Sequence, residues 1–103
     1  MTFADTGDYG KPRPAVVIQT DLLPETESVL LCLIGSAEEE IPFCRRIAVE
    51  PSAANGLRKP SQIMADKILA VRRRRCRKVI GRLEADTLER LNESLALVIG
   101  LLD

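Results

Sequence analysis

The chain has 103 residues, a hydrophobic fraction of 46% and a formal net charge of zero, so we expect residues 1–103 to fold as a single domain with an apolar core. It contains no histidine, which excludes imidazole from any general base, Ser-His-Asp triad or zinc site. No apolar run approaches the roughly 18 residues that cross a bilayer, and no charged leader precedes a cleavable segment, so we expect a soluble, cytoplasmic protein.

Short runs rich in Val, Ile and Leu predict β-strands along most of the chain. The predicted strands cover residues 14–19, 29–34, 43–50, 61–66, 67–71 and 78–83. The segments between them, DLLPETES, GSAEEEIP and PSAANGLRKP, are rich in residues typical of turns and loops.

The hydrophobic period changes near the C-terminal end. Apolar residues there recur three and four positions apart, at Leu88, Leu91, Leu95, Val98 and Leu102. This spacing predicts one amphipathic helix. Its start is open, because Asp86 with Glu89 forms a capping box whereas Glu84 could act as the cap instead. The expected fold is mainly β within the α+β class: five to six short strands curled into a small barrel, with the helix laid against it.

Basic residues are concentrated in one stretch of the chain. Residues 67–82 hold eight Lys or Arg and no acid, whereas residues 83–103 hold five acids and one Arg. Such a stripe is typical of a surface that binds polyanions, but a solvated face explains it equally well. If the stripe binds RNA, the candidate contacts are Arg73, Arg75 and Arg77. Two Phe, one Tyr and no Trp nearly exclude an aromatic platform for stacking bases.

Cysteines and clustered acids give no sign of a metal site. Cys32, Cys44 and Cys76 are an odd number without CxxC spacing, which favours reduced thiols in the core. Three adjacent acids, Glu38 to Glu40, cannot converge on one ion without other segments, so we interpret them as a solubilising loop. No metal or other cofactor is expected.

A glycine-containing loop leads into an arginine and a buried strand in GDYGKPRPAVV. Alone, this pattern favours a turn, with Arg13 in a salt bridge. The segment nevertheless resembles the MazF/PemK family of toxin endoribonucleases, and further matches follow in order in VLLCLIGS, NGLRKPSQIMADKI and VIGRLEADTLERLNESLALVIGL. The resemblance extends from Asp8 over nearly the whole chain and implies a small Src-homology-like barrel of the MazF/CcdB type. Only Met1 to Ala4 precede Asp5, so we expect a shortened first strand.

The resemblance implies a homodimeric toxin of a type II toxin–antitoxin system. Such a toxin cuts single-stranded RNA, including mRNA, without a metal, leaves 2′,3′-cyclic phosphate and 5′-hydroxyl ends, and thereby inhibits translation and growth. A MazE-like antitoxin is the implied protein partner. Two alternatives share the fold: a CcdB-like toxin that poisons a topoisomerase without catalysis, and a degenerate nucleic-acid-binding barrel.

The resemblance also nominates the residues of the site. Arg13 suits stabilisation of phosphate charge, because its planar guanidinium stays charged. Ser36, where many members have Thr, either donates a hydrogen bond to the phosphate or only caps a turn. Asp8 is the candidate base, although an unperturbed carboxylate with a pKa of about 3.9 is weak and an exposed loop acid is the alternative. Lys11 and Gln62 are predicted to contact RNA, with an exposed strand glutamine as the alternative for Gln62.

Overall fold

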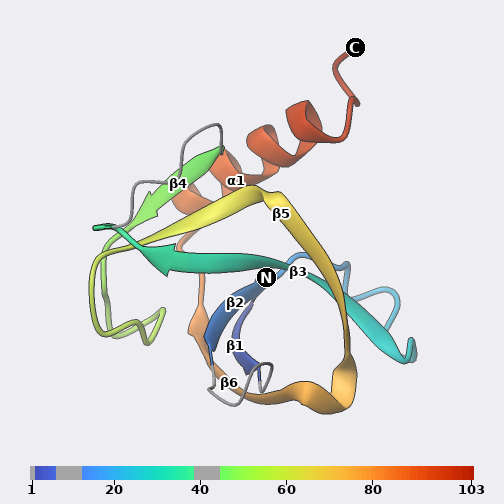
Figure 1. Cartoon of the computed structure of the whole chain (residues 1–103), viewed down its shortest axis with the longest axis horizontal. Coiled ribbons are helices and arrows are strands. Elements are labelled where there is room, and N and C mark those ends of the chain that lie inside the picture. The colour runs from blue at the N-terminus through green and yellow to red at the C-terminus, as the bar shows by residue number, and fades with distance from the viewer. Residues whose placement is uncertain (1, 7–12, 39–44) are drawn as a thin grey trace.

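A computed structural model describes residues 2–6, 13–38 and 45–103 of the protein. The elements in these ranges are β1 (Thr2–Thr6), β2 (Arg13–Val17), β3 (Ser28–Ser36), β4 (Arg46–Val49), β5 (Ser61–Arg72), the 3-10 helix η2 (Arg73–Arg75), β6 (Cys76–Arg82) and α1 (Ala85–Val98), as Figure 1 shows. None of the helices described is long and apolar enough to span a membrane.

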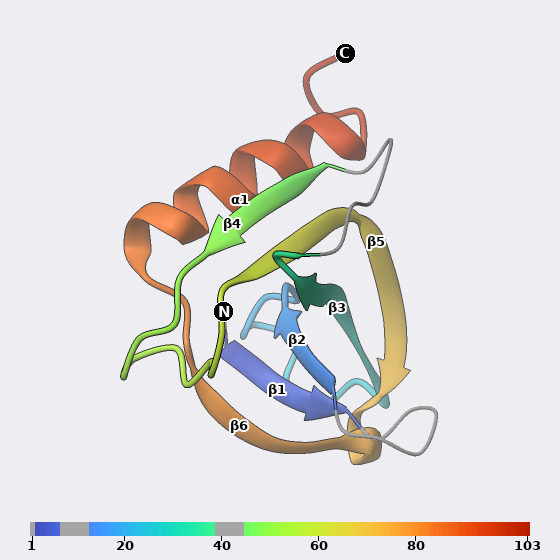
Figure 2. The same ribbon diagram turned by 60° about the vertical axis from the view of Figure 1, so that its left-hand side comes forward.

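The six strands form one antiparallel sheet with the order β4-β5-β3-β2-β1-β6. The sheet curves strongly, and α1 lies across β4 and β5 (Figures 1 and 2). The predicted α+β class is confirmed. The curled sheet is not closed into a barrel, because β4 and β6 are its two edges and no pairing joins them within the described ranges. Since α1 packs on β4 and β5, the helix buries apolar surface near one edge without closure of the ladder.

β5 is one strand of 12 residues, where the sequence predicted two. The apolar pattern breaks at Asp66 and Lys67, which are both exposed, so the run resembles two strands with a boundary between them. The register of β5 against β3 shifts between Cys32 and Ile34. A β-bulge of this kind lets a long strand bend while it keeps its pairing.

Two apolar clusters lie on opposite faces of the central strands. The larger contains Val16, Cys32, Ile34, Ile47, Val49, Ile63, Ala65, Leu83 and Leu91. The smaller contains Ala15, Leu31 and Val71, with Leu33 and Cys76 packed against it. Consecutive residues of β2 and β3 alternate between the clusters, as the pleat of a strand requires. The central strands are therefore covered on both faces.

The C-terminal helix begins after Glu84, which occupies the N-cap position but makes no capping hydrogen bond through its side chain. Asp86 instead lies in the first turn, where its Oδ1 accepts a hydrogen bond from the N–H of Thr87 at 2.9 Å. The helix ends at Val98. Leu102, which the predicted stripe included, therefore lies beyond the helix and is exposed.

Candidate functional site

Arg13, Ser36 and Gln62 lie at the same end of three neighbouring strands. β2 begins at Arg13, β3 ends at Ser36, and β5 pairs Gln62 with Gly35 of β3. The β2–β3 ladder pairs Ala15 with Leu33, and continuing that register by two residues sets Arg13 opposite Gly35. The fold thus brings three of the predicted site residues into adjacent positions across the sheet.

Strand alternation separates Arg13 from Ser36. Ala15 belongs to the smaller cluster and Leu33 packs against it, whereas Ile34 belongs to the larger one. Continuing that alternation by two residues places Arg13 on the face of the smaller cluster and Ser36 on the other face. Any ligand contacted by both side chains must therefore sit at the end of the strands rather than over one face.

Hydrogen bonds give Ser36 and Gln62 structural roles. Ser36 Oγ accepts a hydrogen bond from the N–H of Glu38 at 3.3 Å, which is the turn-capping role that the sequence left open. A hydroxyl that accepts one bond can still donate its proton. Gln62 is buried, and its Nε2 donates to the carbonyl oxygen of Ser36 at 2.9 Å. The interpretation of Gln62 as an exposed strand glutamine is wrong, and its contact with RNA stays a prediction.

The remaining loop candidates fall outside the described residues. Asp8 and Lys11 lie in the undescribed segment 7–12, and the side chain of Arg77 in β6 is likewise not described. The proposed base and two of the RNA contacts therefore stay predictions.

Arg73 ties two distant parts of the chain together. Its Nε donates to the carbonyl oxygen of Thr26 at 2.9 Å, and its Nη2 donates to Thr26 Oγ1 at 3.0 Å and to the carbonyl oxygen of Leu23 at 3.4 Å. The guanidinium thus holds the loop after β2 against η2. The sequence showed no sign of this role, because the partners lie 47 and 50 residues away. Arg75 is exposed in the same 3-10 turn, and its phosphate contact stays a prediction.

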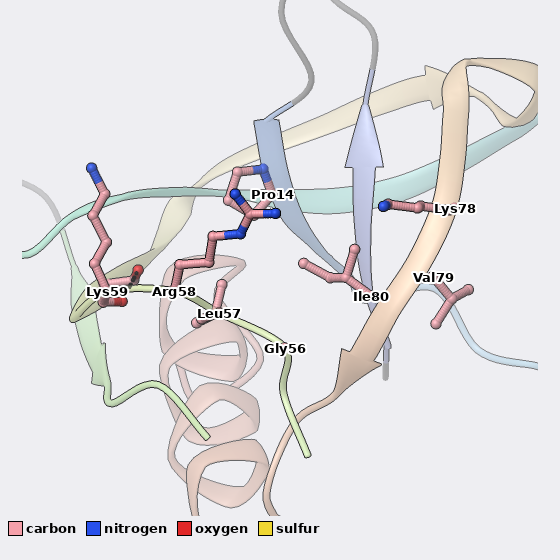
Figure 3. A pocket seen from close by; sticks show the side chains of 9 residues that line it. Pro14, Gly56, Leu57, Arg58, Lys59, Lys78, Val79 and Ile80 are labelled. Atoms are coloured by element: carbon pink, nitrogen blue, oxygen red, sulfur yellow. Dashed lines mark hydrogen bonds between the residues drawn. The ribbon is translucent and has the colours of Figure 1, made fainter. Parts of the chain in front are cut away.

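A cavity of about 820 Å³ lies beside the start of β2. The residues that line it are Pro14, Gly56, Leu57, Arg58, Lys59, Ser61, Lys78, Val79 and Ile80. In Figure 3, Arg58 extends from the loop after β4 and Lys78 from β6. Leu57 and Ile80 are half-buried and pack on the larger cluster. The cavity therefore combines apolar walls with three cationic side chains, and we call it the cationic cavity.

A sequence profile described as "PemK-like, MazF-like toxin of type II toxin-antitoxin system" matches residues 1–99. The chain belongs to this family of toxins. Among its relatives is a protein of Mycolicibacterium smegmatis named "Probable endoribonuclease MazF". The two are 35% identical over 101 residues, which cover 97% of this toxin and 92% of the relative.

Solved structures confirm the MazF-like fold. The Mycobacterium tuberculosis toxin MazF-mt6 superposes with a TM-score of 0.79 at 20% identity, over 97% of each chain. A mycobacterial endoribonuclease in complex with its cognate antitoxin has a TM-score of 0.78 at 19% identity, over 97% of this toxin and 92% of that chain. A MazE-MazF structure from Deinococcus radiodurans has a TM-score of 0.76 at 20% identity, over 96% of this toxin and 91% of that chain.

Sequence reasoning did not select the cations of the cavity in this MazF-like toxin. Arg58 and Lys59 are in a segment interpreted as a loop, and Lys78 is in the basic stripe but was not among the chosen contacts. All three side chains are exposed, and none makes a hydrogen bond or ion pair with another described residue. The available signal was the NGLRKP segment, which carries part of the family resemblance.

Cys32 serves the core of the toxin. Its side chain is fully buried, and burial, with a smaller contribution from the charge of Asp66, raises the pKa of its thiol to about 11. The thiol therefore stays protonated near neutral pH, a form that is neither nucleophilic nor a good metal ligand. Cys76 is half-buried beside the smaller cluster, and Cys44 lies outside the described residues.

Proposed function

We propose that this MazF-like toxin is an endoribonuclease that cuts single-stranded RNA, acts in the cytoplasm on mRNA and so stops translation and growth. The observation that carries the proposal is the position of Arg13. It begins β2 at the end of the sheet where β3 ends at Ser36 and β5 pairs Gln62 with Gly35, and the next residue, Pro14, is a wall residue of the cationic cavity. An arginine at this end of the sheet, together with a neighbouring cavity lined by Arg58, Lys59 and Lys78, suits a polymer with a phosphate in every unit.

The proposed reaction uses a nucleophile that the RNA itself supplies. The ribose 2′-oxygen attacks the adjacent phosphorus, a new P–O2′ bond forms, and the P–O5′ bond breaks. The 2′-hydroxyl proton passes to a base, for which Asp8 is the candidate, and a proton reaches the leaving 5′-oxygen. The products are a 2′,3′-cyclic phosphate and a 5′-hydroxyl, and no metal is needed to generate the nucleophile.

Arg13 is assigned to charge stabilisation in this reaction. Negative charge accumulates on the non-bridging oxygens in the transition state, and a preorganised guanidinium offers two parallel donors to them. Its proton is held too tightly for acid catalysis. The Ser36 hydroxyl is assigned a supporting hydrogen bond at the end of the strands.

The cationic cavity is assigned to the nucleotides that flank the cleaved bond. Arg58, Lys59 and Lys78 would pair with phosphates, while Leu57 and Ile80 offer apolar contact to a base or ribose. A single strand can place its bases in such a cavity, whereas a duplex hides them. We therefore expect sequence preference to depend on the cavity walls.

The alternative of a non-enzymatic CcdB-like toxin is less well supported. The M. smegmatis relative, at 35% identity over nearly the full chain, is named an endoribonuclease. Fold alone would not separate the two functions, but this relationship together with Arg13 favours RNA cleavage.

Chelation and analysis of the product ends test the reaction. We expect the purified toxin to cut single-stranded RNA in excess EDTA and to leave 5′ ends that polynucleotide kinase labels without prior phosphatase treatment. An RNA with 2′-deoxyribose at the cleaved nucleotide is the matched control, and it should resist cutting because it lacks the nucleophile. Loss of all cutting under chelation, or products with 5′-phosphates, would contradict the mechanism.

We further propose that the toxin acts as a homodimer and is silenced by an antitoxin whose extended tail is rich in acidic and apolar residues. Solved relatives include an endoribonuclease with its cognate antitoxin and a MazE-MazF structure. A cavity with three cations and apolar walls accepts carboxylates as readily as phosphates. A disordered tail can recover the cost of its ordering from a wide contact area.

Competition between tail and RNA tests this occlusion. We expect a tail peptide to raise the apparent Kd of an uncleavable, 2′-deoxy-substituted RNA in proportion to peptide concentration. A peptide of the same composition in scrambled order controls for charge alone. If RNA and tail occupy the toxin together without mutual weakening, inhibition must act elsewhere.

A further inference from the structure

A buried asparagine organises the loop that carries two of the cavity cations. Asn55, between β4 and β5, has no exposed surface. Its Oδ1 accepts hydrogen bonds from the N–H of Ser52 at 3.0 Å and from the N–H of Leu57 at 2.9 Å. One side-chain oxygen therefore fixes the backbone on both sides of Asn55.

The amide nitrogen of the same side chain links the loop to Glu84, the N-cap residue of α1. Asn55 Nδ2 donates to the carbonyl oxygen of Glu50 at 2.8 Å and to the carboxylate of Glu84 at 2.9 Å. Ser52 Oγ donates to the same carboxylate oxygen at 3.0 Å. An asparagine side chain has two donor hydrogens and an oxygen that accepts two bonds, so every hydrogen-bonding position of the Asn55 side chain is used.

Two glycines seat this loop directly against β6. Gly56 has a φ of 69°, and a Cβ added there would lie 2.1 Å from the carbonyl oxygen of Ile80. A Cβ added to Gly81 would lie 2.4 Å from the backbone carbon of Asn55. The N–H of Arg82 also donates to the carbonyl oxygen of Ala54 at 2.8 Å. The loop and the strand that carries Lys78 thus meet backbone to backbone.

We propose that Asn55 and Glu84 are positioning residues of the RNA site, because they lock the Gly56–Lys59 segment against β6. We call the hydrogen bonds of the Asn55 side chain with Glu50, Ser52, Leu57 and Glu84 the lock. The lock holds Arg58 and Lys59 on one side of the cationic cavity while Lys78 projects from the other. Without it, the cost of ordering Arg58 and Lys59 when RNA binds would outweigh what their two phosphate contacts return, so both contacts would be lost and binding would weaken. This inference rests on the proposed function, since it takes RNA phosphates as the ligands of these cations.

The first test separates binding from chemistry. Asn55→Ala should raise KM for RNA by roughly tenfold, the cost of ordering two long side chains, while kcat at saturating RNA stays close to that of the natural toxin. With the uncleavable RNA, the slope of log Kd against log salt should fall by about 1.4, because two phosphate contacts at about 0.7 each are lost. Asn92→Ala, at an exposed asparagine of α1, is the matched control and should leave both quantities unchanged.

Further variants tie the effect to the lock and to the cations. Glu84→Gln keeps an oxygen that accepts from Asn55 and Ser52, so it should bind RNA like the natural toxin, whereas Glu84→Ala should behave like Asn55→Ala. Arg58→Gln with Lys59→Gln should reproduce the loss of binding and of salt slope. Adding Asn55→Ala to that pair should then weaken binding little further, because the two changes remove the same contacts.

Hydrogen exchange tests the lock without RNA. The N–H groups of Gly56 and Leu57 donate to the carbonyl oxygen of Ser52 and to Asn55 Oδ1, so Asn55→Ala should speed exchange at both. If exchange is unchanged, the lock is wrong. If exchange rises but KM and the salt slope do not move, the positioning role is wrong. If the natural toxin neither binds nor cuts RNA, the proposed function fails, while the exchange rates still show whether the lock exists.

If Asn55→Ala does not fold, Ser52→Ala and the comparison of Glu84→Gln with Glu84→Ala provide the same test.

Discussion

Replacing Arg13 by alanine is expected to lower kcat/KM for RNA cleavage by about 10²-fold or more. The substitution removes one preorganised donor to the charged transition state, and losses of that size are typical of such donors. Arg13→Lys should recover part of the loss, because the charge remains while the two parallel donors do not. Single-turnover cleavage of an end-labelled RNA measures the effect.

The control for this prediction is an arginine remote from the cavity. Arg90 lies on α1, is exposed, donates from Nη2 to the carbonyl oxygen of Ala48 at 3.4 Å and does not line the cationic cavity, so Arg90→Ala should cut RNA at the natural rate. Ser36→Ala should lower kcat/KM for RNA cleavage less than Arg13→Ala does, since a neutral hydroxyl forms a weaker hydrogen bond to phosphate than a guanidinium does. Equal cleavage by the natural toxin and Arg13→Ala would remove Arg13 from the site.

Gly81→Ala is expected to reduce the free energy of unfolding by about 3 kcal/mol. The added Cβ would lie 2.4 to 2.5 Å from backbone atoms of Ala54 and Asn55, and backbone cannot turn aside as a flexible side chain can. The loop must therefore lift from β6 or the strand must move. Urea unfolding followed by circular dichroism measures the change.

Gly100→Ala is the matched glycine control. Gly100 has a φ of 80°, but the nearest atom to an added Cβ is a carboxylate oxygen of Asp103 at 3.2 Å, on an exposed side chain at the end of the chain. Gly100→Ala should therefore reduce the free energy of unfolding by about 1 kcal/mol, which is the cost of placing alanine in the left-handed backbone conformation. If both variants unfold at the same urea concentration, the loop does not rest on β6 as described.

Most of the fold could be predicted from the sequence because burial leaves a local pattern. Runs of β-branched and apolar residues marked the strands, and the change to a helical period marked α1. The continuity of β5 could not be predicted, because Asp66 and Lys67 are exposed within the strand and imitate a boundary. The open edges of the sheet also have no local sign, since they depend on which distant strands pair.

The candidate site was predictable only where a motif carried it. Arg13 stands in a recognisable segment, and the strand predicted at residues 14–19 is observed as β2 over Arg13–Val17. The cationic cavity depends on the approach of the loop after β4 to β6, and the Asn55–Glu84 contact joins residues 29 positions apart. Composition and spacing carry no information about such contacts, so the sequence does not distinguish Asn55 from an ordinary loop residue.

The length of β5 has a consequence for how the molecule opens. Ile63 and Ala65 belong to the larger apolar cluster and Val71 to the smaller, and β3 pairs with β5 beside both. Opening either cluster must break part of this common ladder and so weaken the other. The two apolar clusters are therefore coupled through this ladder, and we expect the described strands to unfold as one cooperative unit.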